Sequence, residues 1–410
     1  MNSPIARFKN EYLRRSAKHI GTPPSEKSGG TMMNIKLSFA IICVIIMVSC
    51  NNMTISNPNP FYGINVDSLE MPLVNRNTIY VGEGIGNRPL SSQVVSESNE
   101  EKYYLLDDNK IFVFNWDDGK LCDSIMLTER ESLGNYSGFS VVSKDTILLY
   151  NYANKTIQHV NAKGDVLGVI TLRENESVNV DIEGLNGTRI QEINQQIVGT
   201  GAILGDTRNH RFSEMKASVA LSFYHPSVKT LMTYPEIYRK ANWGGVYMNM
   251  VYHTSAKGRF MFYSFPIDHH VYKVDMDTGE TTSFYMGSKY CDEIKSSKSD
   301  FMEEFIDKNR RVNYYLHEYS YAMILFDEYR EQIIRIAEHP AEKIEDDGTF
   351  AKPFSVIVTD LEGKKISESR IFEEAKELNL YNMHITKQGL AISYIQKDEN
   401  KIVFKCYDLK

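Results

Sequence analysis

Asp268-His269-His270 is the densest group of potential metal ligands in the sequence. Imidazole nitrogens and carboxylate oxygens are common ligands of transition metals. Adjacent residues of a β-strand point to opposite faces, however, so His269 and His270 cannot easily hold one ion. Residues 275–280 (DMDTGE) carry only part of a calcium-loop pattern, because the further oxygen ligands and the glutamate at the twelfth position are missing. We interpret residues 275–280 as a hairpin turn, and we predict no metal site and no cofactor.

Nucleophilic catalysis has no clear signature in this chain. There is no Gly-x-Ser-x-Gly elbow, and no cysteine has a histidine partner in a catalytic pattern. We therefore predict no catalytic residue. Tyr314, Tyr315, His317 and Tyr319 form an aromatic cluster that could stack on a sugar or a peptide, and interior packing is the favoured alternative.

One structural unit recurs along the chain. It consists of apolar strands, an Asn or Asp, a tight turn with a glycine, and another strand. The unit occurs at residues 110–125, 156–170, 270–285 and 354–369, and a truncated copy at 401–410 ends the chain. The turn glycines can adopt the positive φ that closes a hairpin. They are Gly119, Gly164, Gly279 and Gly363.

The spacing of these units predicts the fold. The marker Asn or Asp recurs after 46 residues at first and after 48 at the end, and the interval of 114 between Asn161 and Asp275 has room for a degenerate copy at 217–235. Units of four short strands every 40–50 residues or so are typical of a β-propeller. We predict an all-β, six-bladed β-propeller, with a seven-bladed ring as the alternative. Residues 77–82 (NTIYVG) should complete the last blade as its outer strand.

Two insertions interrupt the strands. Residues 299–311 (SDFMEEFIDKNRR) are expected to form a short helix, because Phe301, Phe305 and Ile306 share one face. Residues 178–212 are rich in Gly and Asn and are expected to contain an irregular loop. Long loops on propellers often lie over the channel mouth, where ligands bind.

The C-terminal half resembles a known family. Residues 320–340, 354–369 and 383–393 are similar to domain-of-unknown-function (DUF) family 4221, TolB-like six-bladed β-propeller lipoproteins of Gram-negative bacteria. The shared pattern is an aromatic-led strand, an Asp-x-Tyr-Arg turn and a nearby arginine. The resemblance extends over residues 60–410 and implies the fold and an envelope location, since the family has no established activity.

The resemblance also selects the predicted ligand-binding residues, which are Asp327, Tyr329, Arg330 and Arg335. A guanidinium group recognises a carboxylate or a phosphate bidentately. The alternative is that Arg330 pairs with Asp327 or Glu328 and stabilises the turn. Arg335 follows two isoleucines, where the family often has tyrosines, and this difference weakens a role for that aromatic pair.

Residues 32–50 indicate where the protein goes. Lys36 precedes an apolar run of twelve residues, 37–48, and Ser49 and Cys50 follow it. The run is shorter than the roughly 20 residues of a membrane-spanning helix and fits a signal-peptide core. Its end resembles the lipobox of bacterial lipoproteins, in which the cysteine is lipidated and becomes the N-terminus. Met47 stands where leucine is usual, and the alternative is an uncleaved anchor or a free cysteine.

These features divide the chain into four parts. We interpret residues 1–31 as a mis-assigned N-terminal extension, 32–49 as the lipoprotein signal peptide, 50–76 as a lipid-anchored tether and 77–410 as the propeller domain. We expect a lipid-anchored protein of the cell envelope, at the outer membrane and facing the periplasm.

Composition restricts the function further. The whole chain carries a net charge of −7, and residues 1–49 hold seven basic and two acidic side chains, so the remainder carries −12. Such an acidic body excludes nucleic-acid binding through a basic field. The expected function is a binding module for an envelope protein partner or a small ligand. The alternatives are a hydrolase or lyase with channel-lining residues and a structural subunit of an envelope complex.

Overall fold

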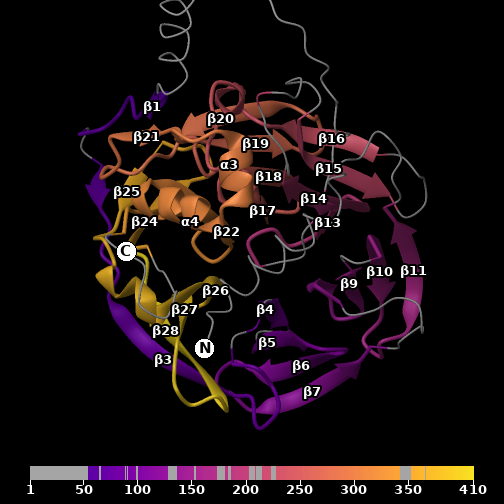
Figure 1. Cartoon of the computed structure of the whole chain (residues 1–410). Helices are drawn as coiled ribbons and strands as arrows, with labels where there is room; N and C mark the ends of the chain where they lie inside the picture. Colours follow the sequence, from indigo (N-terminus) through magenta and orange to yellow (C-terminus); the bar gives the residue numbers. More distant parts are fainter. Residues whose placement is uncertain are drawn as a thin grey trace, which may run out of the picture.

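The strands form a ring of six blades. The computed structural model describes residues 54–410 with short gaps. The gaps are 64–65, 88, 90, 98–99, 128–135, 152–153, 173–180, 183–185, 203–207, 209–214, 223–227, 342–351 and 365. Six of the sheets that the described strands form are arranged around a common axis, as a β-propeller (Figure 1). The six-bladed prediction is therefore confirmed.

Each blade is mainly antiparallel, and its first strand faces the centre of the ring (Figure 1). Blade 1 comprises β4 (Ser92–Glu97), β5 (Glu100–Asp107), β6 (Lys110–Asn115) and β7 (Leu121–Met126). Blade 2 comprises β8 (Gly138–Ser143), β9 (Thr146–Asn151), β10 (Thr156–Val160) and β11 (Val166–Thr171). Blade 3 comprises β12 (Asp181–Ile182), β13 (Gln191–Ile193), β14 (Gln196–Ala202), β15 (Lys216–Ser222) and β16 (Val228–Thr233).

The second half of the ring recruits strands from the N-terminal segment. Blade 4 comprises β17 (Tyr252–Ala256), β18 (Phe260–Ser264), β19 (His270–Asp275) and β20 (Thr281–Tyr285). Blade 5 comprises β22 (Ser320–Asp327), β23 (Gln332–Glu338), β24 (Phe354–Asp360), β25 (Ile366–Glu368) and the parallel β2 (Asp67–Ser68). Blade 6 comprises β26 (Leu378–Thr386), β27 (Gly389–Tyr394), β28 (Lys401–Tyr407) and β3 (Leu73–Tyr80).

The recurring units are the third and fourth strands of the blades. Residues 110–125, 156–170, 270–285 and 354–369 form those strands in blades 1, 2, 4 and 5, and the degenerate copy at 217–235 does so in blade 3. Their four turn glycines all have positive φ. Middle strands such as β9 and β24 are almost wholly buried, whereas the outer strand β11 alternates between half-buried and exposed residues. This gradient arises because neighbouring blades cover both faces of a middle strand.

The ring closes as the sequence predicts. β3 pairs with β28, so the N-terminal strand completes the blade formed by the C-terminus (Figure 1). The strand begins at Leu73, four residues before the expected start of the domain at Asn77. Gly119 has φ +68°, and a Cβ there would lie 1.7 Å from the carbonyl oxygen of Thr78, so the turn of blade 1 needs glycine where it packs on β3.

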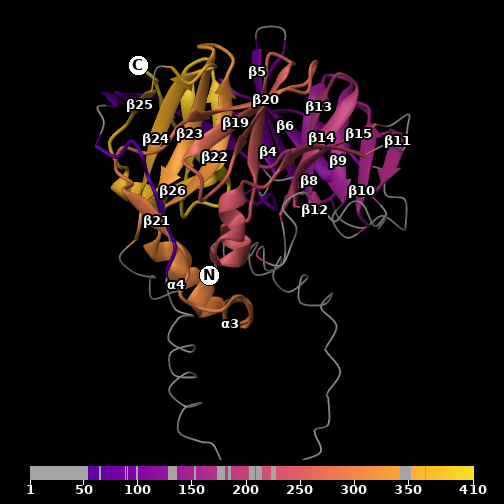
Figure 2. The same ribbon diagram turned by 90° about the horizontal axis from the view of Figure 1, so that it is seen from above.

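The predicted helix at 299–311 is in fact two helices. α3 (Phe301–Ile306) ends at Asp307, and α4 (Lys308–His317) starts there. The Asp307 carboxylate accepts hydrogen bonds from the backbone N–H groups of Asn309 and Arg310. An N-cap residue has non-helical backbone angles, which explains the break. Both helices stand out from one face of the ring, which we call the helical face (Figure 2).

The N-terminal segment is attached to the same region. β1 (Ser56–Pro58) pairs with β21 (Glu293–Lys295) just before α3. Three single turns of 3-10 helix complete the described elements: η3 (Glu236–Arg239), η4 (Gly245–Tyr247) and η5 (Glu373–Glu377). Within the described part of the chain, no helix has the length and apolarity needed to cross a membrane.

Candidate binding site on the propeller axis

A short segment from blade 3 enters the centre of the ring. The first strand of this blade is split into β12 and β13, and residues 186–190 leave the sheet between them. We call this segment the plug. The prediction of an irregular loop at the channel is confirmed for these five residues, and other parts of the 178–212 region lie outside the described residues. The plug therefore brings its own side chains to the axis.

The plug is bonded to the first strands of several blades. Asn186 Oδ1 accepts from the backbone N–H of Ser92 in β4 at 2.8 Å, and Asn186 Nδ2 donates to the carbonyl oxygen of Tyr381 in β26 at 2.5 Å. The carbonyl oxygen of Gly187 accepts from the backbone N–H of His253 in β17 at 3.3 Å. Since these contacts reach blades 1, 4 and 6, the plug is held rigidly at the axis.

Local sequence features make room for this arrangement. A Cβ on Gly187 would lie 2.8 Å from the ring of Tyr252 and 3.2 Å from the sulfur of Met323, so only glycine fits. In β26 the pairing with β27 jumps between Asn379 and Met383. Such a bulge bends a strand and redirects its side chains. It places the Tyr381 carbonyl and the side chain of Asn382 against the plug and β4.

Arg189 is the only charged side chain of the plug. One of its terminal nitrogens, Nη2, donates to the carbonyl oxygen of Ser92 and, at 3.3 Å, to Asn186 Oδ1. The donors on Nε and Nη1 have no hydrogen-bond partner among the described residues. Burial lowers the pKa of Arg189 to about 10, and no acidic group opposes this shift. The side chain nevertheless stays partly exposed. A guanidinium that has no counter-ion among the described residues thus lies deep in the ring.

Two buried histidines lie near this charge. Burial and the charge of Arg189 lower the pKa of His253 to about 4 and the pKa of His384 well below its usual value. Both imidazoles are therefore neutral at pH 7. Within the described residues, His253 Nε2 and Asn382 Nδ2 are buried without a hydrogen bond of good geometry, although the backbone of Arg189 lies near His253 and the hydroxyl of Tyr103 lies near Asn382. The axial site therefore combines one positive charge with neutral polar groups.

The buried His253 should make stability depend on pH. Its pKa is about 4 when folded and about 6.5 when unfolded, so the unfolded chain binds more protons between these values. Stability from this residue is complete above pH 6.5 and is lost as pH falls towards 4. We expect the advantage of wild type over His253→Gln to shrink by about 2 kcal/mol between pH 7 and pH 5, as measured by urea unfolding.

Thr200→Val is the matched control for this experiment. Thr200 Oγ1 lies 2.9 Å from His253 Nδ1, so the variant removes the same contact without removing a titratable group. Its deficit relative to wild type should be equal at the two pH values. A deficit of His253→Gln that does not change with pH would contradict the prediction.

Three of the four residues predicted from the family resemblance lie together, at the end of β22 away from α4. Arg330 contacts Asp327 at 3.1 Å and Asp408 at 3.2 Å. The hydroxyl of Tyr329 donates to Glu101 in blade 1 at 2.9 Å. The turn therefore joins blade 5 to blades 1 and 6. Asp327 is completely buried, and Tyr329 is 37% exposed. A ligand at this turn stays a prediction, while the contacts match the alternative in which Arg330 stabilises the turn.

Arg335 lies elsewhere, in the interface of blades 4 and 5. Its side chain is completely buried and stacks over the ring of Tyr321 at 3.7 Å. Nε donates to Ser264 Oγ, and the terminal nitrogens donate to the carbonyl oxygens of Met286, Phe265 and Asp268. Its donors face protein acceptors on every side, so the structure separates Arg335 from the turn that holds Arg330.

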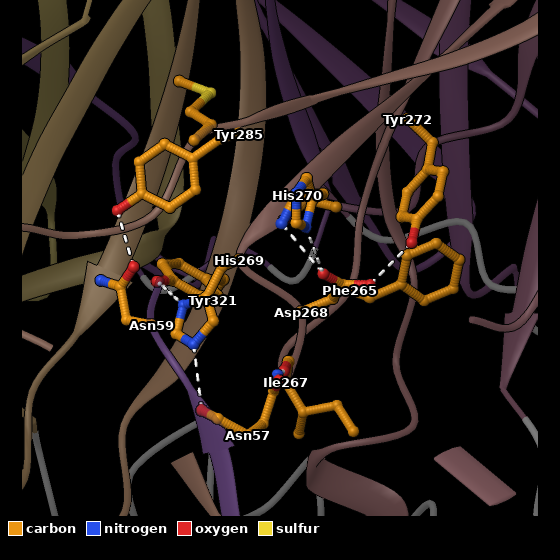
Figure 3. A network of polar contacts seen from close by, with 12 residues as sticks. Asn57, Asn59, Phe265, Ile267, Asp268, His269, His270, Tyr272, Tyr285 and Tyr321 are labelled. Carbon is orange, nitrogen blue, oxygen red and sulfur yellow. Dashed lines mark hydrogen bonds and ion pairs between the residues drawn. The ribbon is translucent and has the colours of Figure 1, made fainter. Parts of the chain in front are cut away.

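The Asp268-His269-His270 group belongs to a network of the protein's own contacts (Figure 3). Asp268 accepts from the hydroxyl of Tyr272 at 2.7 Å and contacts His270 Nδ1 at 3.2 Å. His269 Nδ1 lies instead 2.7 Å from the hydroxyl of Tyr321. The two histidines therefore have separate partners. No group of three potential metal ligands is found within the described residues.

The aromatic cluster is part of α4 and its packing. Tyr315 is buried, stacks on Tyr247 and donates to Glu338, whereas His317 is exposed. Beside α4, a groove of 560 Å³ runs along residues 295–299 to the start of the described chain at Thr54. Burial raises the pKa of Glu318 in this groove to about 7.

Fold and site together define a six-bladed β-propeller with a polar plug on its axis. The chain belongs to the family of the domain of unknown function DUF4221, whose model matches residues 68–370. The predicted membership is thus confirmed.

Two solved structures share this architecture. A crystal structure of a DUF4221 family member from Bacteroides vulgatus ATCC 8482 has a TM-score of 0.72 and 18% identity, and the match covers 84% of this chain and 99% of that one. A putative exported protein from Bacteroides fragilis NCTC 9343 has a TM-score of 0.51 and 10% identity, with coverage of 85% and 97%. At such identities the likeness shows the fold alone. No curated protein sequence matches this chain significantly.

Proposed function

We propose that this protein is a lipid-anchored binding module of the cell envelope that holds a small oxyanion, a carboxylate or a phosphate, at Arg189. The observation that carries the proposal is the partly exposed guanidinium of Arg189, which lies deep in the ring and has no acidic partner in the part of the chain that the structure describes. Buried charges in proteins are normally paired, because desolvation of an unpaired charge is costly. An anionic ligand would supply the missing partner.

The groups around Arg189 favour an anion over other ligands. The donors on Nε and Nη1 point in different directions in the guanidinium plane, and each can bind one oxygen atom of an anionic ligand. His253 and His384 stay neutral, so the local charge remains +1 at pH 7.

Binding is favoured over hydrolysis because the hydroxyl of Ser92, which lies beside His384, is buried. Ser92 Oγ lies 3.2 Å from His384 Nε2, which resembles a nucleophile and its base. Ser92 is completely buried, however, and its hydroxyl donates to Asn382 Oδ1 at 2.8 Å. A substrate carbonyl has no open approach to this oxygen. The hydroxyl thus serves to hold the site in place.

Replacement of Arg189 tests the oxyanion site. Inorganic phosphate and acetate are titrated separately, at constant ionic strength, and stability is followed by thermal unfolding. Wild type should be stabilised in a saturable manner, by about 2.7 kcal/mol at a ligand concentration of 100 times Kd. Arg189→Gln should lose this effect, yet be no less stable than wild type without ligand, because it removes a desolvated charge that has no acidic partner among the described residues, while the glutamine amide can still donate to the Ser92 carbonyl oxygen.

Arg259→Gln is the control for general effects of the anions. Arg259 is 49% exposed and pairs with Asp275 on a hairpin of blade 4. Phosphate also stabilises proteins by exclusion from their surface, and this effect should be equal in all three proteins. Equal stabilisation of wild type and Arg189→Gln, or a lower stability of the unliganded variant, would assign Arg189 to the fold.

The envelope location rests on the sequence around Cys50, which lies outside the described residues. The similar protein from Bacteroides fragilis is described as exported, which supports this location. An envelope protein partner remains part of the proposal, with the outer membrane facing the periplasm as the expected site. Cys50→Ala should abolish labelling by a fatty-acid probe, and continued labelling of the variant would rule out Cys50 as the anchor.

A further inference from the structure

We infer that the helical face rests on the lipid bilayer, with the exposed apolar side of α3 in the membrane interface. Ile306 is 77% exposed and Met302 is 50% exposed. These two residues are four positions apart, so they share one side of α3. Phe301 and Phe305 stack on each other on a neighbouring side of the helix and are only half-buried. The exposed side chains of Met302 and Ile306 therefore form a short apolar edge on the outer side of α3.

The first described residues of the chain lie next to the start of α3. Ile55 exchanges two hydrogen bonds with Ser296, one from its N–H to Ser296 Oγ and one from the N–H of Ser296 to its carbonyl oxygen, both 2.8 Å. β1 then continues this attachment along β21. Ser296 lies only five residues before α3. The segment that follows the proposed lipid anchor is thus fixed to the base of the insertion.

The length of the remaining chain sets the orientation of the whole ring. Four residues lead from Cys50 to Thr54, and even a fully extended chain covers at most about 14 Å in that distance. If Cys50 carries acyl chains, as the proposed function requires, Thr54 must lie within this distance of the bilayer surface. Thr54 lines the groove beside α4. The helical face, from which α3 and α4 project, must then face the lipid (Figure 2).

The charges around α3 are compatible with this contact. Glu303 pairs with Arg310 at 2.9 Å, and Asp307 pairs with the same arginine at 3.5 Å. Asp300 pairs with Arg208 at 3.7 Å. These three carboxylates and two arginines leave a net charge of only −1, so they oppose contact with a lipid surface less than three free carboxylates would. A short amphipathic helix of this kind lies in the interface rather than across the membrane.

A tryptophan on α3 tests the inference. The lipidated full-length protein with Ile306→Trp is reconstituted into phosphatidylcholine vesicles whose acyl chains are brominated near the headgroup. Leu167→Trp is the control, because Leu167 is 59% exposed on the outer strand β11. The native Trp116 and Trp243 are each 1% exposed and give a constant background. Fluorescence from position 306 should be quenched by bromine and shifted to the blue, and fluorescence from position 167 should be unchanged.

The other outcomes separate this inference from the lipid anchor on which it rests. Acylation at Cys50 is read independently by intact mass, and membrane attachment by flotation of the vesicles. An acylated, floating protein with unquenched position 306 overturns the orientation alone. Quenching at both positions overturns it too, since the contact would not be specific to α3. A protein that is not acylated overturns the lipid anchor and the orientation together.

Discussion

Arg335→Met should destabilise the protein more than any other single replacement of an arginine in the described chain. The methionine keeps the apolar contact with Tyr321 but leaves three backbone carbonyl oxygens and Ser264 without their donor. A buried polar group left unsatisfied costs about 1–3 kcal/mol. Although removal of a buried charge returns part of this free energy, we expect a net loss of at least about 3 kcal/mol in urea unfolding.

Arg259→Met is the matched control for Arg335→Met. Arg335 lies in β23 of blade 5 and Arg259 in the turn between β17 and β18 of blade 4, but Arg259 is half exposed and contacts carboxylates at the surface. An exposed ion pair contributes about 0–1 kcal/mol, so the control should stay within that range. If the two variants unfold at the same urea concentration, the four hydrogen bonds of Arg335 do not stabilise the interface of blades 4 and 5.

Opening the ring should have a comparable effect on stability. Ile79 in β3 is completely buried and lies opposite Ile402 in β28. It packs in a cluster between blades 6 and 1 with Tyr103, Phe114 and Trp116 among its neighbours. Ile79→Ala should lower the free energy of unfolding by about 2–5 kcal/mol. Deletion of residues 77–82 should cost more, because it also exposes the edge of β28.

The adjacent residue provides the control for the closing strand. Tyr80 points to the opposite side of β3 and is 58% exposed, so Tyr80→Ala should change stability by no more than about 0.5 kcal/mol. Thermal melting of the three variants against wild type measures both effects. A deletion variant that melts at the wild-type temperature would show that the ring is stable without its closing strand.

The sequence predicted most of the architecture because the relevant signals are local. The turn at Gly119 needs positive φ at that position alone. The strands on either side, β6 and β7, are recognised from the apolar residues within their own short segments. Regular spacing then gave the number of blades, and the leftover strand at 77–82 gave the closure. The helix break at Asp307 was missed because an aspartate within a helical pattern is also compatible with one continuous helix.

The axial site could not be predicted in the same way. Its members come from different blades: Ser92 contacts Asn186 over a separation of 94 residues and Asn382 over 290. The only local signal was the Asn186-Gly187 pair within a loop rich in glycine and asparagine. Which inner-strand positions meet at the axis depends on the closed ring and on the bulge in β26. No short stretch of sequence contains that information.

The arginines show most clearly which features the sequence predicts and which depend on the tertiary structure. Arg330 and Arg335 are five residues apart in a segment that the family resemblance treats as one motif, but one lies at a turn and the other in a blade interface. Arg189 carried no signal at all. The sequence by itself determined the strands, the turns and the ring. Only the tertiary structure decided which guanidinium groups meet protein acceptors and which one stays open, because a charge is satisfied by groups that approach it in space, whatever their distance along the chain.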